Sequence, residues 1–154
     1  MYHYRESGLP NVYLQDGYRK VQTAYGPSVV IEDVEGLHRA LAIMLVNERP
    51  HLTGPEVRFI RRYLEKTQAE LASLLGVEEQ SVRRWERLAR VPKPADRALR
   101  LLFLNTLRDQ PKCVPDFEDL VEHAQSNDEA HRRVNLRFRP RAQERWQPEE
   151  AKAA

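Results

Sequence analysis

The chain has 154 residues, 41% of them hydrophobic and 31% charged, with a formal net charge of +2, which is typical of one soluble domain of ordinary size or two small ones. The longest apolar run, Ala40–Val46, is too short to cross a bilayer, and no apolar stretch follows the N-terminal residues as it does in a secretory signal. The one cysteine, Cys113, excludes an internal disulfide and a multi-cysteine zinc site. We therefore expect a cytoplasmic protein that does not bind membranes.

Basic residues concentrate in the middle of the chain. Residues 51–112 carry 13 Lys or Arg and 8 Asp or Glu, whereas residues 1–50 carry 5 and 6 and residues 113–154 carry 7 and 9. A basic segment in a nearly neutral chain indicates a module that contacts a polyanion, although such clusters are also common on solvated faces.

Residues 1–50 are predicted to form a small α+β unit. Asp16 and Gly17 are typical of a two-residue turn between strands, Tyr25–Ser28 of a second turn, and Val29–Ile31 of a third strand, which together predict a three-stranded meander. The following segment, Gly36–Val46, is predicted to be a helix that covers this sheet. Its apolar residues share one face at helical spacing: Leu37, Leu41, Met44 and Leu45.

Residues 51–125 are predicted to form four to five helices. The first spans roughly residues 55–65, because Pro55 stands at its start and apolar residues follow at helical spacing. The second opens at the capping box of Thr67 and Glu70 and ends at Gly76. A third begins near Glu79, a fourth runs from Pro94 to about Arg108, and residues 116–124 are a candidate fifth.

Residues 126–154 are predicted to form a polar, arginine-rich C-terminal tail. Between Arg132 and Arg141, apolar and polar residues alternate, which favours a short strand used in a dimer contact. An arm that grips DNA and a frayed polar tail are the alternatives.

The second and third central helices fit a helix-turn-helix. Ala72 is small enough for a close helix crossing, Gly76 tolerates the positive φ of the turn, and Val77 is expected to fill the core. The third helix should bury Val82 and Trp85 and present its polar residues to a groove.

The stretch from Thr67 to Glu86 resembles the Xre family, the helix-turn-helix of phage Cro and repressor proteins, and the resemblance extends over about residues 56–108. Seven positions carry residues characteristic of that family: Gln68, Ala72, Gly76, Val77, Val82, Trp85 and Glu86. The fold expected is therefore mainly α, an Xre-type bundle of four to five helices preceded by the small α+β unit.

The resemblance implies roles for individual residues. Glu79, Gln80 and Arg84 fall on the base-reading positions, where an arginine can bind guanine and a glutamine adenine. The residues expected at the DNA backbone or flanking it are Thr67, Gln68, Ser81, Arg83, Arg87, Arg90 and Lys93. Arg61 and Glu86 are expected to form a structural ion pair that does not touch DNA.

Three features depart from the family pattern. Glu78 is a poor N-cap, and Glu79 would be repelled by phosphates unless it accepts a hydrogen bond from a cytosine amino group. The loop after Glu86 lacks the usual glycine and instead carries Arg90 and Lys93, two cations that could grip the DNA backbone.

The order of a β-rich unit, a helix and an Xre domain also resembles MqsA-type antitoxins. In that family a four-cysteine zinc site lies in the N-terminal unit, which neutralises the toxin. Here Tyr2, Tyr4, Glu6 and Ser7 occupy the stretch of the first cysteines, so no zinc is implied. A metal-free relative would need the helix at residues 36–47 and an aromatic cluster to hold its sheet together. The cluster expected is Tyr13, Tyr18 and Tyr25.

No pattern of catalytic or metal-ligating residues stands out. The five histidines show no metal-ligand spacing, and His38 is more typical of a core boundary than of a ligand. Cys113 is a lone thiol, which is more often incidental than redox-active. We expect no enzyme activity, no metal and no cofactor.

The sequence therefore predicts a sequence-specific DNA-binding transcriptional regulator, a repressor that binds a pseudo-palindromic operator as a homodimer. The apolar run Leu101–Leu104 of the fourth helix is the expected dimer contact. One hypothesis makes the chain an antitoxin that binds a protein toxin through its N-terminal unit and autoregulates its operon. The alternative is a stand-alone phage- or plasmid-type repressor whose N-terminal unit is a sensor or protein-interaction module.

Overall fold

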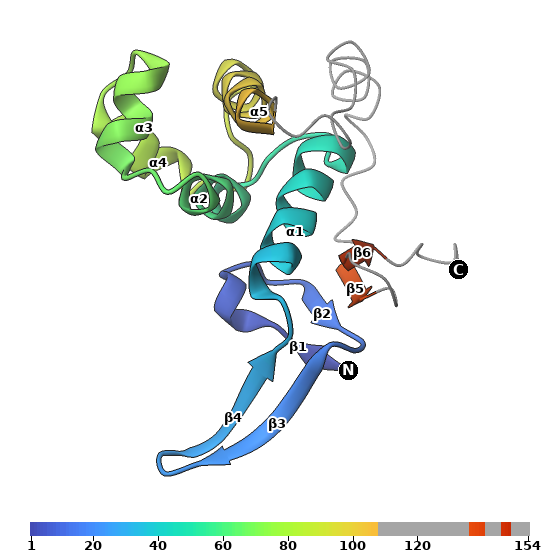
Figure 1. The fold of residues 1–154 in the computed structure, drawn as a ribbon. Coiled ribbons are helices and arrows are strands. Elements are labelled where there is room, and N and C mark those ends of the chain that lie inside the picture. Colours follow the sequence, from blue (N-terminus) through green and yellow to red (C-terminus); the bar gives the residue numbers. More distant parts are fainter. Residues whose placement is uncertain (108–135, 141–145, 149–154) are drawn as a thin grey trace. The chain divides into compact units, whose positions relative to one another are not determined.

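The computed structural model describes residues 1–107, 136–140 and 146–148, and it combines an α+β unit with a unit of helices (Figure 1). Unit 1 comprises Met1–Leu41 and Arg133–Ala154, and unit 2 comprises Ala42–Arg132. The predicted boundaries, at residues 50 and 125, therefore differ from the observed division. The observed division between Leu41 and Ala42 falls inside helix α1 (Val34–Glu48), so one uninterrupted helix contributes residues to both units.

The larger sheet of unit 1 is built from both ends of the chain. Its four strands are β1 (Tyr2–His3), β2 (Val12–Leu14), β5 (Leu136–Pro140) and β6 (Trp146–Pro148), in the order β1-β2-β5-β6. Strand β5 pairs in parallel with β2 and antiparallel with β6. The strand prediction for the C-terminal region is confirmed for Leu136–Pro140. Because both of its edges are paired within the chain, this strand has no edge left for a dimer contact.

The predicted three-stranded meander is wrong. Strands β3 (Tyr18–Thr23) and β4 (Gly26–Ile31) form a separate two-stranded antiparallel sheet, called the hairpin below, and β2 does not pair with β3. The turn at Asp16 and Gly17 is present, since the Asp16 carboxylate accepts the Gly17 N–H at 2.8 Å and Gly17 has a φ of 74°. This turn carries the chain from one sheet to the other, because β2 finds its partners in β1 and β5.

The predicted aromatic cluster does not exist either. The Tyr13 ring stacks on His3 with centroids 4.6 Å apart, and the Tyr18 ring lies 5.4 Å from Tyr2. Tyr25 is fully exposed, because it stands in the two-residue loop at the tip of the hairpin. The sheet is held instead by aliphatic burial, with Val12 and Leu14 of β2 completely covered.

Helix α1 buries the predicted face. Leu37, Leu41 and Leu45 are completely buried and Met44 is 4% exposed. His38, at the edge of this face, is half-buried and shares a 2.8 Å hydrogen bond with the Tyr4 hydroxyl. This position at a core boundary matches the one predicted for His38.

Unit 2 contains four further helices among the described residues: α2 (Gly54–Tyr63), α3 (Gln68–Leu75), α4 (Glu79–Trp85) and α5 (Lys93–Leu107). They confirm the four predicted helices to within about two residues at each end. The candidate helix at residues 116–124 lies outside the described residues. Among the described helices, none is both long and apolar enough to span a membrane.

The start of α2 is fixed by a second capping box and a close helix crossing. Thr53 is the N-cap, and its backbone N–H donates to the Glu56 carboxylate at 2.8 Å. Gly54 lies against the end of α4, where an added Cβ would stand 2.5 Å from the Glu86 carbonyl group. Only glycine allows this approach, which lets the Gly54 N–H donate to the Leu88 carbonyl at 2.8 Å.

A buried arginine joins α5 to the end of α1 and to the segment that follows it. Arg100 is 4% exposed, and its guanidinium donates to the Asp96 carboxylate, to the Val46 carbonyl and to the Arg49 carbonyl. The other Asp96 oxygen accepts the backbone N–H of Leu52 at 2.6 Å. Every charge in this cluster is therefore paired, as a buried ion pair requires.

Replacing Arg100 should test this cluster. Arg100→Gln leaves the buried Asp96 carboxylate without its cation, so the free energy of unfolding should fall by about 3–5 kcal/mol in urea titrations. Arg97→Gln is the matched control, because Arg97 is exposed on the same helix and should change stability by less than about 0.5 kcal/mol. Equal losses in the two variants would contradict the role given to Arg100.

The stability of the protein should also depend on His38. Burial lowers the pKa of His38 from its ordinary value, so the folded state favours the neutral ring. The resulting stabilisation is complete above the pKa of the unfolded chain, about 6.5, and is lost as the pH falls below it. Thermal unfolding followed by circular dichroism should show a drop in Tm between pH 7.5 and 5.5. The drop should be smaller in His38→Gln and should persist in Tyr4→Phe, which keeps the ionisable ring.

Candidate nucleic-acid interface

Helices α3 and α4 are joined by a short turn whose geometry follows from local sequence. The Thr67 hydroxyl accepts the Glu70 N–H at 3.1 Å, and the Glu70 carboxylate accepts the Thr67 N–H at 2.7 Å. This backbone hydrogen bond lowers the pKa of Glu70. At the other end of α3, Gly76 adopts a φ of 68° and its N–H returns to the last turn of the helix. Both predicted signals, the capping box and the glycine turn, are confirmed.

Helix α4 has one buried and one exposed face. Val82 is completely buried and Trp85 is 8% exposed, as predicted. Glu78 precedes the helix as an N-cap without a side-chain hydrogen bond, which confirms that it is a poor cap. The other side of α4 and the residue pair that follows it carry the exposed polar side chains: Glu79, Gln80, Arg83, Arg84 and Arg87. Ser81 is half-buried at the edge of this face.

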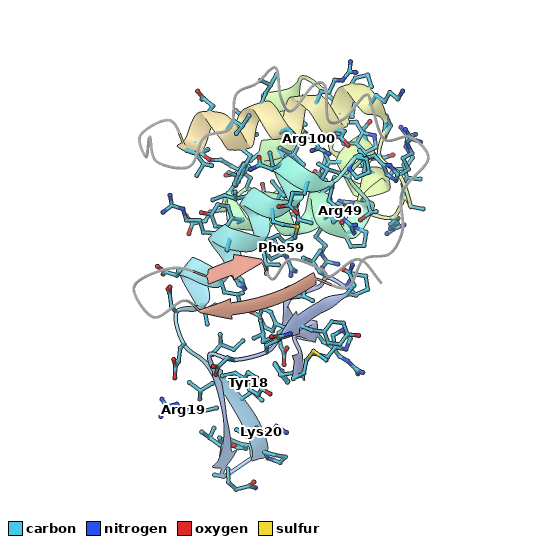
Figure 2. All side chains as sticks on the ribbon, turned by 90° about the vertical axis from the view of Figure 1, so that its right-hand side faces the viewer. Tyr18, Arg19, Lys20, Arg49, Phe59 and Arg100 are labelled. Atoms are coloured by element: carbon cyan, nitrogen blue, oxygen red, sulfur yellow. The ribbon has the colours of Figure 1, made fainter. Side chains whose placement is uncertain are left out.

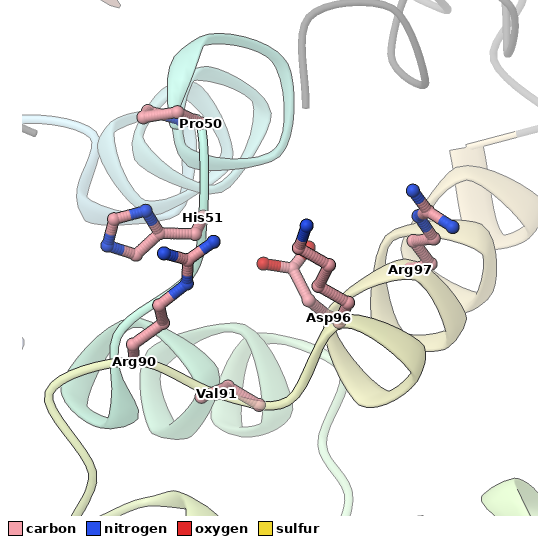
Figure 3. A pocket seen from close by; sticks show the side chains of 7 residues that line it. Pro50, His51, Arg90, Val91, Asp96 and Arg97 are labelled. Carbon is pink, nitrogen blue, oxygen red and sulfur yellow. The ribbon is translucent and has the colours of Figure 1, made fainter. Parts of the chain in front are cut away.

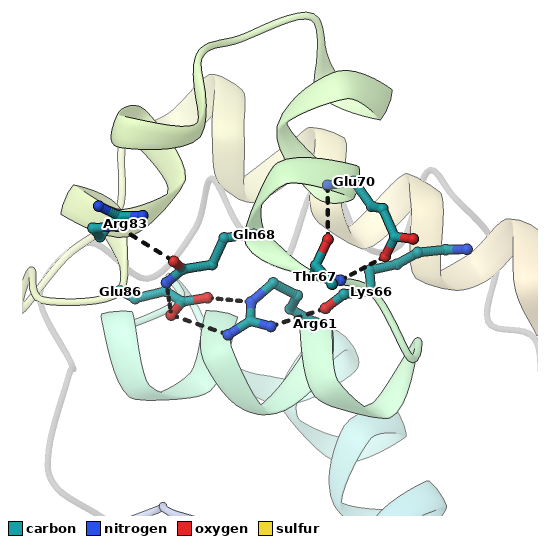
Figure 4. A network of polar contacts seen from close by, with 7 residues as sticks. All are labelled: Arg61, Lys66, Thr67, Gln68, Glu70, Arg83 and Glu86. Atoms are coloured by element: carbon teal, nitrogen blue, oxygen red, sulfur yellow. Dashed lines mark hydrogen bonds and ion pairs between the residues drawn. The ribbon is translucent and has the colours of Figure 1, made fainter.

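A polar network fixes α4 to α2 and α3 (Figure 4). The Arg61 guanidinium donates to the Glu86 carboxylate at 2.5 Å and 3.3 Å, and also to the Lys66 carbonyl at 2.8 Å. The side chains of this ion pair are only 11% and 6% exposed. The predicted pair of Arg61 and Glu86 is therefore present, and its burial fits a structural role.

Gln68 connects this buried pair to the exposed face of α4. Its amide nitrogen donates to the Glu86 carboxylate at 2.9 Å, and its amide oxygen accepts from Arg83 at 3.5 Å. Arg83 also donates to Glu79 at 2.8 Å, one turn earlier on α4. The ion pair partly neutralises Glu79, which lowers the repulsion expected between this carboxylate and phosphates.

Arg84 and Gln80 differ from Arg83 because they are not engaged by neighbours. Both are exposed, and neither side chain forms a hydrogen bond or ion pair with another residue in the described ranges. They stand on α4 at a spacing of four residues, so they are neighbours on one helix surface. The arrangement offers a guanidinium and an amide side by side, the two groups that make two-pronged contacts with purines.

The segment from α4 to α5 forms a small basic pocket (Figure 3). Arg90 and Lys93, which the sequence predicts to contact the DNA backbone, both line this pocket, together with Arg97 and His51. Asp96, the one acid in the lining, is engaged by Arg100. Sequence analysis missed Arg97 and His51, although the spacing of Lys93 and Arg97 places two cations on one face of α5.

Two predictions about apolar surface need correction. Val77 does not fill the core but is 36% exposed, because the turn at Gly76 directs the chain outward before α4 begins. In the run Leu101–Leu104 proposed for dimer contact, Phe103 is completely buried and Leu104 is 9% exposed. These two residues face the core of unit 2, so Leu101, at 46% exposed, is the main apolar residue that α5 presents in this run.

The described residues contain no group of three or more His, Cys, Asp or Glu side chains placed to hold a metal ion. Comparison of the chain with protein-family models, with curated proteins and with solved structures gave no match. The residues of α4 themselves offer exposed hydrogen-bond donors and positive charge on a helix fixed from behind.

Substituting Arg61 should test its structural role. Arg61→Lys keeps the charge but cannot contact both Glu86 oxygens and the Lys66 carbonyl, so the free energy of unfolding should fall by about 1–3 kcal/mol. Arg62→Lys, at the exposed neighbouring position, should be nearly neutral. Urea titrations measure both changes, and equal losses in the two variants would contradict the structural role given to Arg61.

Proposed function

We propose that this chain is a sequence-specific DNA-binding transcriptional regulator, a repressor in which α3 and α4 form an Xre-type helix-turn-helix. The observation that carries the proposal is the two-sided character of α4. One side is buried through Val82 and Trp85 and fixed by the Arg61–Glu86 ion pair, and the other presents exposed arginines. A short helix held rigidly from behind, with donors in front, is what major-groove recognition requires.

Base reading is assigned to Arg84, Gln80 and Glu79. Arg84 is free to bind the O6 and N7 atoms of guanine, and Gln80 the N6 and N7 atoms of adenine. Glu79 accepts from a cytosine amino group when Arg83 moves from it to a phosphate, and their exposed ion pair costs little to break.

Contacts with the DNA backbone are assigned to residues on and around α4. Arg83 and Arg87 lie on or just after α4, and Arg90 and Lys93 line the basic pocket. The remaining residues assigned to the DNA backbone flank the surface that faces the groove: Thr67, Gln68 and Ser81. Such contacts supply affinity and salt dependence, whereas the base contacts supply specificity.

A homodimer on a pseudo-palindromic operator follows from the small size of the reading surface. One short helix contacts too few base pairs for useful specificity, and a two-fold dimer doubles the site. Leu101, exposed on α5, is the apolar contact offered for this dimer.

The N-terminal unit has two proposed roles. In an antitoxin it would bind a protein toxin, and the toxin gene would stand beside the gene for this chain. In a stand-alone repressor it would be a sensor or protein-interaction module, without such a neighbour.

Fluorescence anisotropy with DNA from upstream of the protein's own gene tests the proposal. Specific binding should exceed binding to a scrambled duplex by at least ~1,000-fold, with two chains per duplex. Arg84→Ala should cost about 1–3 kcal/mol on the specific duplex and relax the preference at one base pair in each half-site. Gln80→Ala should also lose specific affinity but leave the salt dependence unchanged, because glutamine neutralises no phosphate.

The control is the scrambled duplex at low salt, where Gln80→Ala should bind as tightly as the wild type. Equal loss on both duplexes in Arg84→Ala would contradict a base-reading role for Arg84. Absence of binding by the wild type to any DNA at low salt would overturn the proposed function.

A further inference from the structure

The hairpin of β3 and β4 is the most exposed element of the described structure. None of its twelve strand residues is buried, and both strands pair only with each other among the described residues (Figures 1 and 2). An isolated two-stranded hairpin is marginally stable in water. The side chains at its tip are nevertheless fixed, since the Thr23 hydroxyl donates to the Gly26 carbonyl at 2.8 Å and accepts the Tyr25 N–H.

The two faces of the hairpin differ in their surroundings. The two strands pair without a break, from Tyr18 opposite Ile31 to Thr23 opposite Gly26. Successive residues along each strand therefore point to opposite faces. One face carries Tyr18, whose ring lies against Tyr2, and its residues Val29 and Ile31 are half-buried. This face therefore contacts the rest of unit 1 at its base, whereas nearer the tip it carries three exposed residues, Lys20, Gln22 and Pro27.

The opposite face, called the outer face below, is open. It carries Arg19, Val21, Thr23, Ser28 and Val30, and only Val21 among them is half-buried. The Arg19 side chain is 71% exposed, and its contact with Glu32, at 3.8 Å, is a surface ion pair that costs little to break. The outer face therefore combines a cation, two hydroxyl groups and two valines.

The strand edges are poorly suited to receive another strand. Lys20 and Arg19 stand on β3, and Pro27, which lacks a backbone N–H, stands on β4. Charged residues and proline are devices that discourage pairing at sheet edges. A partner of the hairpin therefore has to dock on a face, and the open face is the outer one.

Charge indicates the kind of partner. No acidic residue occurs between Asp16 and Glu32, while Arg19 and Lys20 both fall in this stretch, in a chain whose charges otherwise almost balance. The Thr23 hydroxyl already donates to the Gly26 carbonyl, so the outer face offers the Ser28 hydroxyl and two valine side chains, which suit base edges and the thymine methyl. A cation beside these groups, without an acidic residue on either strand, favours a polyanion as the partner.

We propose that the hairpin is a second DNA-binding element, whose outer face lies in the major groove of duplex DNA. The major groove admits a two-stranded β-ribbon, and six residues per strand extend over about 20 Å. Arg19 binds a phosphate at one groove wall and Ser28 faces the base edges, while Lys20, on the opposite face, adds to the positive potential of the hairpin. This inference rests on the proposed regulator function and extends it to unit 1, which the Xre resemblance does not cover.

The first test measures salt dependence. The full-length variant Arg19→Gln should bind the upstream duplex several-fold more weakly, and its slope of log K against log salt should be shallower by about 1. The charge-preserving variant, Arg19→Lys, should retain the wild-type slope. An unchanged slope in the glutamine variant would overturn the proposal.

The second test distinguishes the faces. Ser28→Glu and Gln22→Glu each add one negative charge on adjacent rungs of the hairpin, the first on the outer face and the second on the opposite face. Both positions are exposed, so both variants should fold, which circular dichroism checks. Ser28→Glu should weaken DNA binding far more than Gln22→Glu, and equal effects would refute the outer-face contact.

The same titrations include Arg84→Ala, which separates the two proposals. If Arg84→Ala loses specificity while every hairpin variant binds like the wild type, the regulator stands and the hairpin contact falls. If the hairpin variants lose affinity while Arg84→Ala loses nothing, the hairpin binds DNA and the assignment to α4 falls. Retained DNA binding by hairpin variants that lose a protein partner would assign the outer face to that protein and overturn the DNA contact.

Discussion

The buried guanidinium of Arg100 is the interaction on which the arrangement of unit 2 depends. Water cannot reach this guanidinium, because Arg100 is almost completely buried. Its N–H groups must therefore donate to acceptors within the protein. They do so with Asp96 on the same helix, with the Val46 carbonyl near the end of α1 and with the Arg49 carbonyl just after that helix. Helix α5 is thereby held at one position against the chain segment that leads into α2.

A second buried ion pair connects the Arg100 cluster to the helices that hold α4. Glu56 closes the capping box of α2 and pairs with Arg49 at 2.6 Å, so α2 begins where the Arg100 cluster ends. From α2, Arg61 reaches Glu86 at the end of α4, and Gln68 brings α3 into the same network. The direction in which α4 presents Arg84 is therefore set by paired charges behind it rather than by contacts of Arg84 itself. Such preorganisation lowers the entropy lost on binding.

Sequence patterns identified the elements whose causes are local. The capping box at Thr67 and the glycine turn at Gly76 act over a few residues, and the helices of unit 2 followed from them. The capping box of Thr53 and Glu56 is equally local and marks the start of α2. The partner of β2 could not be inferred, because its pairing with β5 joins distant parts of the chain. Arg100 resembles a surface residue in an amphipathic pattern, and only the carbonyls that converge on it explain its burial.

The parallel pairing of β2 with β5 has a consequence for synthesis on the ribosome. All the described helices of unit 2 lie between these two strands in the chain, so they leave the ribosome before β5 is made. Domains generally fold as they emerge, and contacts between distant segments form late. Unit 2 can therefore reach its native packing while β2 still exposes an unpaired edge. The larger sheet of unit 1 closes only after translation has passed β5, although its first strands are synthesised earliest.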